Sequence, residues 1–296
     1  MASLKEVKSK ISGVKKTKQI TKAMKMVATS KLRGCQMVMD AFRPYANKFA
    51  EVLSNIVEKA GEEASPLMTP RDEVRSVHIV LLTSDRGLCG GFNMNLIEKA
   101  ESLMTEMVKK GYKVSVTNFG KKGRDWSKKN KVDVLNSYLN IVGTKFGFTV
   151  ASKAGQELIN GFLNGNYDEV YIVYATYLSM ANQPPVVKKL LPIPVIEKKE
   201  TSTDMNSTYM AEHIIEPSPE ELLNEMLPRN VYNQIYNALL ETSTSEHAAR
   251  MRSMDNATKA CDDMIDSLTL AYNKARQASI TKELMDIVGG AEALRG

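Results

Sequence analysis

The stretch "CDDMIDSLTLAYNKA", residues 261–275, decides the fold. Its apolar side chains recur at spacings of 4, 3, 4 and 3, at Cys261, Ile265, Leu268, Tyr272 and Ala275. A 4-3 spacing places them along one side of an α-helix, as in the seam of a coiled coil. The stretch therefore predicts a helix that pairs with a second helix.

The helix around this seam is predicted to be long. Ser218, Pro219 and Glu221 form a start signal, with an N-cap residue, proline at the first helical position and glutamate three residues after the cap. No proline or glycine lies between Pro228 and Gly289, which is a natural C-terminal stop. A helix over residues 229–288 would be about 90 Å long.

The partner helix is predicted at the N-terminus. Leu4, Val7, Ile11 and Val14 begin a stripe with spacings of 3, 4 and 3, and the helical pattern continues to a stop at Gly61. Pro44 marks the place where this helix would kink. Because no other segment is long enough, we expect the N- and C-terminal helices to form an antiparallel coiled coil.

Between the two helices, short strands alternate with helices. Strands are predicted at 74–83, 112–120, 132–141, 168–179 and 184–196, and helices at 93–111 and 149–166. Alternation of this kind indicates a Rossmann-like α/β domain with a mostly parallel sheet, and the prolines of the last strand suit a sheet edge. We therefore expect an α/β fold class with three parts: a coiled-coil helix over 1–61, the α/β domain over 74–200, and a second coiled-coil helix over 217–290.

These lengths have a geometric consequence. A central domain of about 140 residues has a diameter on the order of 40 Å, so it cannot cover helices about 90 Å long. A bare rod with apolar side chains outside its seam, such as Met26, Ile280, Leu284 and Ile287, would be prone to aggregate. We expect other chains to cover the end of the rod.

The charge is unevenly distributed. The chain carries a net charge of +6, yet residues 1–39 hold ten lysines and arginines against Glu6 alone, so the other 257 residues sum to 6 − 9 = −3. A basic terminal segment suggests an acidic partner, which would be nucleic acid, lipid headgroups or an acidic protein. A solvated helix face is the alternative. The same segment has little aromatic interleaving to favour nucleic acid.

The glycine-rich stretch "LLTSDRGLCGGFN", residues 81–93, raises the alternative of a nucleotide-binding enzyme. A dinucleotide-binding loop needs G-x-G-x-x-G, and a P-loop needs a lysine after its last glycine. Gly87, Gly90 and Gly91 match neither pattern, and Asp85 would oppose a phosphate. The stretch is therefore interpreted as a tight turn that lets the next helix pack closely on the sheet.

Other chemistry has little support in the sequence. Three scattered cysteines and three scattered histidines predict no metal site and no disulfide framework, and they favour a reducing compartment. No apolar run approaches the roughly 20 residues that cross a bilayer, and no secretory signal is present. We expect no cofactor and no direct insertion into lipid.

Three stretches resemble the gamma subunit of F-type ATP synthases of the bacterial type: residues 3–32, 83–93 and 245–294. The resemblance covers the full chain, although residues 110–215 carry little signature. It implies a rotor shaft without a catalytic site, which turns inside a hexamer of alpha and beta subunits. The α/β foot would rest on the membrane c-ring beside the epsilon subunit, on the cytoplasmic face of the inner membrane. It also implies no nucleic acid partner.

The resemblance also implies contact residues. Arg276, Gln277 and Thr281 match positions that touch a catch loop of the beta subunit, and Arg250 matches a second catch contact. Arginine suits such a role because it forms bidentate, charge-assisted hydrogen bonds. Met24 matches a position facing an acidic loop of beta, and Lys22 and Lys25 lie beside it in the sequence. The alternative for each residue is an ordinary solvated or coiled-coil position.

In the foot, Glu216 matches a position near the polar loops of the c-ring. Family members can carry tyrosines just upstream, where this chain has His213 and Ile215. The chloroplast-type insert with paired cysteines is missing, so thiol control of that kind is not expected. The choice between protons and sodium, the direction and regulation of rotation, and inhibition by epsilon lie outside what the residues indicate.

Overall fold

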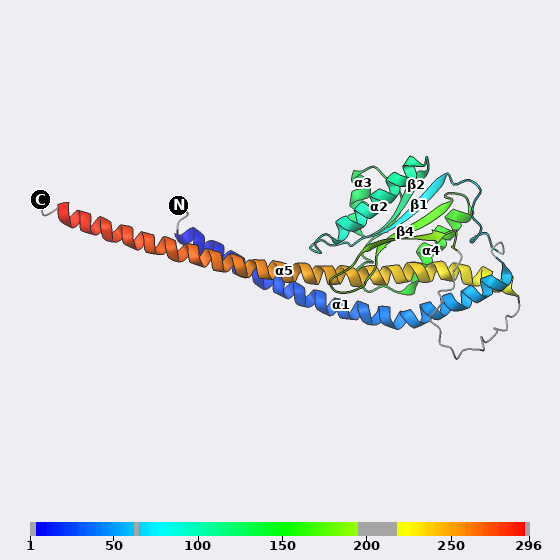
Figure 1. Ribbon diagram of the computed structural model, residues 1–296, viewed down its shortest axis with the longest axis horizontal. Helices are drawn as coiled ribbons and strands as arrows, with labels where there is room; N and C mark the ends of the chain where they lie inside the picture. The colour runs from blue at the N-terminus through cyan, green and yellow to red at the C-terminus, as the bar shows by residue number, and fades with distance from the viewer. Residues whose placement is uncertain (1–3, 62–64, 195–217, 294–296) are drawn as a thin grey trace, which may run out of the picture. The chain divides into compact units, whose positions relative to one another are not determined.

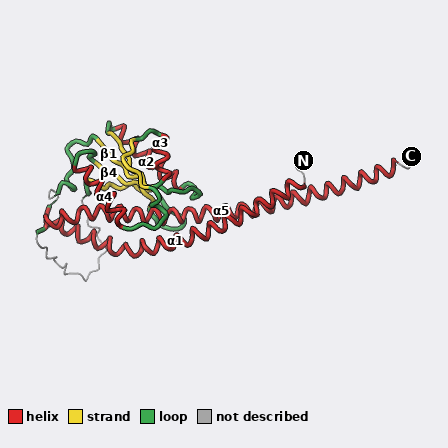
Figure 2. Tube along the Cα trace, turned by 180° about the vertical axis from the view of Figure 1, so that it is seen from behind, coloured by secondary structure: helices red, strands yellow, loops and turns green. Residues whose placement is uncertain are grey.

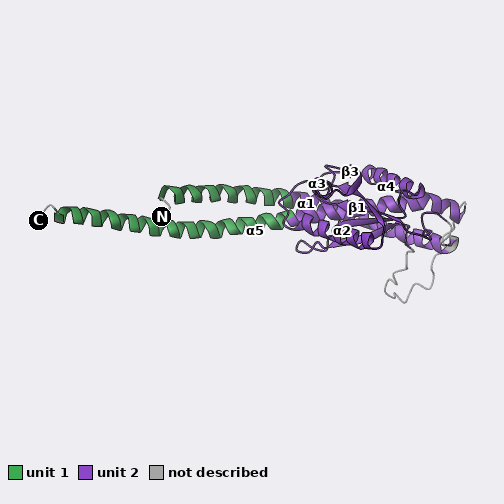
Figure 3. Cartoon of the chain, turned by 90° about the horizontal axis from the view of Figure 1, so that it is seen from above, with its two compact units in different colours: residues 1–29, 250–296 green, residues 30–249 purple. Residues whose placement is uncertain are grey.

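The computed structural model describes residues 4–61, 65–194 and 218–293, and it divides the chain into two compact units (Figures 1 and 3). Unit 1 joins Met1–Thr29 to Arg250–Gly296, and unit 2 is Ser30–Ala249. Two long helices, α1 (Leu4–Ala60) and α5 (Pro219–Ala293), contribute to both units. The predicted combination of long terminal helices and a central, mostly parallel sheet is confirmed.

The ends of the helices agree with the sequence at some points and differ at others. Helix α1 ends before Gly61, whose φ of 86° is left-handed and whose N–H donates to the Val57 carbonyl at 2.9 Å. Helix α5 runs through Pro228 without interruption, and it continues past the expected stop at Gly289 to Ala293. A proline removes one backbone hydrogen bond, but the fully buried neighbours Leu227 and Val231 hold the helix in place by packing.

A five-stranded sheet forms the centre of unit 2. Its strands are β1 (Ser76–Leu82), β2 (Lys113–Phe119), β3 (Asp133–Tyr138), β4 (Glu169–Ala175) and β5 (Pro185–Leu191). Their order is β3-β2-β1-β4-β5, in which the first four strands are parallel and β5 pairs antiparallel with β4 at the edge. Ile79 on the central strand is level with Val116 on β2 and Tyr171 on β4.

Three shorter helices complete unit 2: α2 (Phe92–Lys109), α3 (Lys121–Lys129) and α4 (Phe148–Leu163). Helix α3 was not predicted from the sequence. Its stretch "KKGRDWSKK" has a single large apolar residue, Trp126, so it lacks the apolar periodicity by which a helix is recognised. The tertiary structure supplies the missing signal, because Trp126 packs against the apolar cluster on one face of the sheet.

The core of unit 2 has two layers, one on each face of the sheet (Figures 1 and 2). Side chains alternate along β1, so Ile79 and Leu81 pack towards α2, while Val80 and Leu82 pack on the other face. That second face is covered by α4 together with residues 49–57 of α1 and residues 222–239 of α5. The long helices are thus part of the core of unit 2.

In unit 1 the two long helices pair with each other. Lys18 forms an ion pair with Asp262, the Thr21 and Thr258 hydroxyls lie 2.8 Å apart, and Lys25 Nζ lies 2.6 Å from Asp255 Oδ1. Residue numbers rise along α1 as they fall along α5, with sums of 280, 279 and 280, so the pair is antiparallel. At this register Leu4 lies opposite residue 280 − 4 = 276, and α5 continues alone beyond it (Figure 3).

Candidate functional sites

On α1, the three proposed contact residues differ in their exposure. Lys22 is exposed, whereas Met24 and Lys25 are half-buried. Lys25 donates to Asp255, and this hydrogen bond, joined by a contact from Lys259, lowers the pKa of the Asp255 carboxyl. The charge of Lys25 is therefore already used within unit 1, and Lys22 is the lysine of this group that a partner can reach.

On α5, Arg276, Gln277 and Thr281 are all exposed at the start of the stretch that has no α1 segment opposite it. At 100° per residue they span about 140° of the helix surface, so one partner loop can reach all three. The Thr281 hydroxyl donates to the Gln277 carbonyl at 2.9 Å, which leaves its oxygen free to accept from a partner. The structure thus groups these three predicted residues.

Arg250 is separated from this group. It lies 26 residues earlier on α5, about 39 Å along the helix, and it is only 9% exposed. A partner has little access to its side chain in the free chain. Glu216, the remaining predicted contact residue, lies outside the described residues.

Beyond Arg276 the helix exposes large apolar side chains on several sides. The exposed fractions lie between 49% and 69% for Ile280, Leu284, Met285, Ile287 and Val288. Together these five residues form what we call the apolar tip. Exposed apolar clusters are typical of surfaces that a partner covers.

The glycine-rich loop between β1 and α2 is closed by its own side chains. The Ser84 N–H donates to Asn93 Oδ1 at 2.9 Å, and Asn93 Nδ2 donates to the Ser84 hydroxyl at 2.8 Å and to Cys89 Sγ at 3.2 Å. Across the loop, Asp85 Oδ1 accepts the Lys121 N–H at 3.0 Å. Because the Ser84 N–H and the Asn93 amide are used internally and the Asp85 carboxylate stands beside them, the geometry opposes nucleotide binding here.

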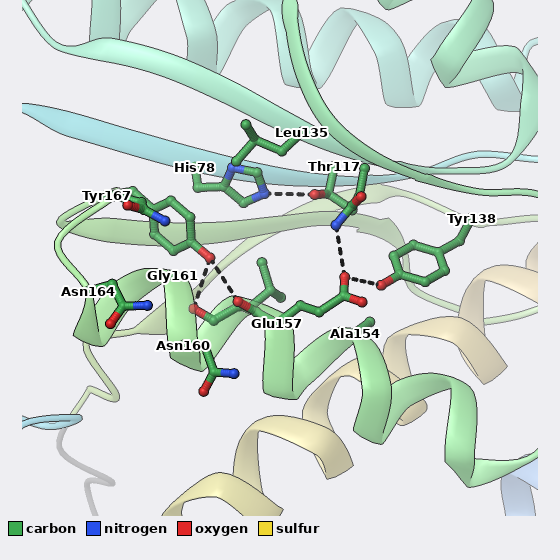
Figure 4. A pocket seen from close by; sticks show the side chains of 13 residues that line it. His78, Thr117, Leu135, Tyr138, Ala154, Glu157, Asn160, Gly161, Asn164 and Tyr167 are labelled. Atoms are coloured by element: carbon green, nitrogen blue, oxygen red, sulfur yellow. Dashed lines mark hydrogen bonds between the residues drawn. The ribbon is translucent and has the colours of Figure 1, made fainter.

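A recess of about 310 Å³ lies between α4 and strands β1, β2 and β3 (Figure 4). Its polar side includes Glu157, whose Oε2 accepts from Asn136 Nδ2 at 2.8 Å and from the Tyr138 hydroxyl at 2.5 Å. Burial, followed by the hydrogen bond to Glu157, raises the pKa of Tyr138. The volume is at the lower end of the range for small-molecule sites.

The floor of the recess holds His78 beside Thr117, which is the geometry of a base next to a hydroxyl nucleophile. His78 Nε2 lies 2.9 Å from Thr117 Oγ1, and Nδ1 lies 2.8 Å from Ser115 Oγ. Burial lowers the pKa of His78 to about 4, so the ring is a weak base, and a hydroxyl stands where a catalytic site would place an orienting carboxylate. The arrangement is that of a buried, hydrogen-bonded histidine that stacks on Tyr167.

The described residues contain no group of three or more histidine, cysteine or acidic side chains that could hold a metal ion. Among the described helices, none has an apolar stretch long and uncharged enough to cross a membrane.

One further group of residues was not predicted from the sequence. Thr242, Ser243, Thr244 and Ser245 are completely buried within α5. The signal was present, because four consecutive hydroxyl residues inside a long helix are unusual for a solvated face that otherwise carries charges. The partners of Thr242, Ser243 and Ser245 lie far away in the sequence, at Gly143 and Ala175, so only the folded chain reveals them. The Thr244 hydroxyl donates to the Leu240 carbonyl one turn earlier.

Known proteins match this chain over its whole length. The family model described as ATP synthase matches residues 3–294. The ATP synthase gamma chain of Desulfosudis oleivorans is 63% identical over 298 residues and that of Nitratidesulfovibrio vulgaris Hildenborough is 53% identical over 296 residues, each covering all of both chains.

Solved structures contain chains with a similar fold. The central stalk/c-ring structure of the Tetrahymena thermophila mitochondrial ATP synthase contains a chain 26% identical to this one, with a TM-score of 0.59, covering 80% of this chain and 99% of that one. A chain of the Euglena gracilis mitochondrial enzyme gives a TM-score of 0.65 at 18% identity, over 98% of this chain and 94% of that one. The chain described here belongs to the ATP synthase gamma chain family.

Proposed function

We propose that this chain is the central stalk (gamma) subunit of an F-type ATP synthase. It turns inside the alpha/beta hexamer and couples ion translocation through the membrane c-ring to ATP synthesis or hydrolysis in the beta subunits. The observation that carries this proposal is the 63% identity to an ATP synthase gamma chain over the full length, including both terminal helices. The subunit itself is not catalytic; catalysis occurs in the beta subunits.

The apolar tip supports a partner that surrounds the end of α5. Leu284, Met285 and Ile287 are each more than half exposed although they are large and apolar. Burying such side chains stabilises a complex by about 1.5–3 kcal/mol each, and a ring-shaped partner can cover several sides of one helix at once. The alpha/beta head is the partner that the family offers for this surface.

The proposed contact residues on α5 and α1 are proposed to act by binding one conformation of the beta subunit more strongly than another. Arg276, Gln277 and Thr281 face one range of directions around α5, so a rotating helix presents them to each beta subunit in turn. A contact that is stronger with one beta conformation shifts the populations of the open and closed states, first in one beta subunit and then in the next. Lys22, Met24 and Lys25 on α1 are proposed to meet an acidic loop of beta, and Arg250 to make a second catch contact.

The α/β fold of unit 2 is proposed to work as the foot. Residues 74–200 would form the functional foot domain, and residues 1–61 and 217–290 the shaft. The foot would contact the epsilon subunit and the c-ring, with Glu216 near the polar loops of the ring. The subunit would then be a peripheral protein on the cytoplasmic face of the bacterial inner membrane, without insertion into lipid and without a nucleic acid partner.

The proposal is tested by assembly and coupling. A tagged chain should co-purify with alpha and beta subunits, and deletion of its gene should abolish ion-driven ATP synthesis in membrane vesicles. The variant Arg276→Ala should lower coupled synthesis by about tenfold, because it removes a charge-assisted contact, without changing the stability of the exposed helix. Lys282→Ala, an exposed neighbour, is the matched control.

Two results would contradict the proposal. One is a purified complex that lacks alpha and beta subunits while the tagged chain is abundant and folded. The other is micromolar binding of ATP, ADP or NAD to the isolated chain in isothermal titration, which would favour a nucleotide-dependent enzyme instead.

A further inference from the structure

Helix α5 carries a fully buried polar stretch where it passes the sheet of unit 2. Nine consecutive residues, 242–250, are buried, and the first six of them, 242–247, are polar. Buried polar side chains destabilise a fold unless they are hydrogen-bonded. Four of these side chains bond to backbone groups at two places in unit 2, at the end of β4 and in the loop between β3 and α4. The Thr244 hydroxyl donates to the Leu240 carbonyl within α5.

The first place is Ala175, the last residue of β4. Its N–H donates to Thr242 Oγ1 at 3.4 Å, and its carbonyl accepts the Ser245 hydroxyl at 3.4 Å. On the neighbouring edge strand, Ala175 is level with Pro185, which has no N–H to donate. Both backbone groups of this residue are thus bonded to α5.

The second place is Gly143, in the loop that leads to α4. Its N–H donates to Ser243 Oγ at 3.1 Å, and its carbonyl lies 3.2 Å from His247 Nε2. Because a carbonyl only accepts, Nε2 carries the proton in this bond. Gly143 has a φ of 76°, and a Cβ at this position would collide with the Glu246 carboxylate, so a glycine is required for the loop to approach the helix this closely.

The four side chains point to two different sides of the helix. At 100° per residue, Thr242 and Ser245 lie about 60° apart, and Ser243 and His247 lie about 40° apart. The centres of the two pairs are separated by about 150° around the helix axis. Ala175 and Gly143 therefore hold α5 from nearly opposite sides. We call the four side chains and these two backbone partners the polar collar.

Besides a hydrogen bond from the Tyr232 hydroxyl to Gln156 Oε1 on α4, α5 makes apolar contacts in unit 2, which are of another kind. Leu223, Leu227, Val231, Ile235 and Leu239 pack into the apolar core at intervals of four residues. Apolar packing has no preferred direction, so it resists separation of the helix more than rotation about its axis. Hydrogen bonds depend strongly on angle, and a small rotation of α5 weakens bonds on both sides of the polar collar together.

We propose that the polar collar is the contact through which torque passes between α5 and the α/β fold of unit 2. This inference rests on the proposed function as a rotor shaft. Thr242, Ser243, Ser245 and His247 are then positioning residues, which hold the helix at a defined angle without touching a nucleotide or an ion. The collar ends at the last residues of unit 2, where α5 continues as the helix of unit 1.

The test uses the whole complex in vesicles, with a chain that carries Thr242→Val, Ser243→Ala and Ser245→Ala together. ATP hydrolysis and ATP-driven ion uptake are measured on the same vesicles. We expect hydrolysis to stay within about twofold of wild type, while the number of ions moved per ATP falls at least about threefold, because three directional bonds are lost and the packing is kept. Hydrogen exchange at the Gly143 and Ala175 amides should become faster.

Two controls separate the collar from general damage. Thr242→Ser keeps the hydroxyl and should retain the coupling ratio of wild type. Thr105→Ala removes an exposed hydroxyl that bonds only within α2, and it should change nothing. If the triple variant fails to assemble, the single variants Ser243→Ala and Thr242→Val are measured in the same way, each with a smaller expected loss of coupling.

Two outcomes overturn the proposal. An unchanged coupling ratio with faster exchange at Gly143 and Ala175 shows that the bonds exist and carry no torque. A parallel fall of hydrolysis and ion uptake shows that the collar only supports folding. Failure of the proposed function is distinct from both, because wild-type vesicles would then show no dependence of ion-coupled ATP synthesis on this chain.

Discussion

One helix carries two regions that reverse the usual distribution of polar and apolar residues. In unit 2, residues 242–247 of α5 are polar and buried; in unit 1, the apolar tip of the same helix is exposed. The first region is buried because the sheet and the loops of the same chain supply its hydrogen-bond partners. The second is exposed because no described residue of its own chain covers it. The polar stretch therefore finds its hydrogen-bond partners within this chain, whereas the apolar tip is typical of a surface that another molecule covers.

The largest expected effect concerns the apolar tip. Replacing Leu284, Ile287 and Val288 with aspartate should weaken association with the alpha/beta head by more than about a hundredfold, since each loses about 1.5–3 kcal/mol of burial. The free chain should unfold at an unchanged denaturant concentration, because all three side chains are exposed in it. The affinity is measured by titrating labelled chain with purified head.

A matched control is Leu163→Asp, at an exposed position of α4 with a similar exposed fraction of 51%. It should leave the affinity for the head unchanged. Equal weakening of the affinity by both variants would show that the apolar tip is not the surface that binds the head.

The next effect concerns the apolar core beside the polar collar. Leu239 is completely buried, so Leu239→Ala should lower the free energy of unfolding by about 2–5 kcal/mol through lost burial and a cavity. Leu270→Ala, on the same helix but 72% exposed, should cost less than about 0.5 kcal/mol. Denaturant titration of the free chain measures both. Similar losses of unfolding free energy from the two variants would show that α5 is packed equally tightly in both units.

The pH dependence of unit 2 should reflect His78. Burial lowers the pKa of its ring from 6.5 to about 4, so the folded state keeps the neutral form. As the pH falls below 6.5 the unfolded chain takes up a proton that the folded chain refuses, and stability declines until the pH reaches about 4. The lowering of the pKa from 6.5 to about 4 corresponds to about 3 kcal/mol.

His78→Gln should flatten this decline, because glutamine keeps hydrogen-bonding capacity near Ser115 and Thr117 without titrating. The measurement is the free energy of unfolding of both proteins between pH 7 and pH 4. If the difference between them does not change with pH, His78 is not a neutral buried group in the folded chain.

The smallest effect concerns the half-buried ion pair between Lys25 and Asp255 in unit 1. Lys25 lowers the pKa of Asp255, so the stabilising contribution of the pair is present above the ordinary aspartate pKa and is lost as the pH falls through the lowered value. Asp255→Asn should therefore weaken the pairing of the two helices slightly, and the loss should shrink at high salt. Glu51→Gln, which removes an exposed pair within α1, is the control. A loss as large as that of Leu239→Ala would contradict this ranking.

Much of the fold could be predicted because its signals are local. The seam from Cys261 to Ala275 and the strand patterns both arise from a side-chain period that a short window of sequence reveals. Helix α3 was missed, because the packing of Trp126 supplies what its local pattern lacks. The continuation of α5 past Gly289 to Ala293 was also missed, and no described residue packs against Gly289 to explain it. The roles of Arg276, Gln277 and Thr281 remain predictions that rest on the family.

The sequence by itself determined the two long helices, the alternation of strands and helices, and the basic N-terminal segment, since each follows from residue type and spacing. The tertiary structure alone decided the antiparallel register of Lys18, Thr21 and Lys25 with their partners on α5. It also decided the burial of Thr242 and Ser243 against Ala175 and Gly143. Those contacts join residues about 70 to 240 positions apart, and their energy exists only once the chain has brought them together.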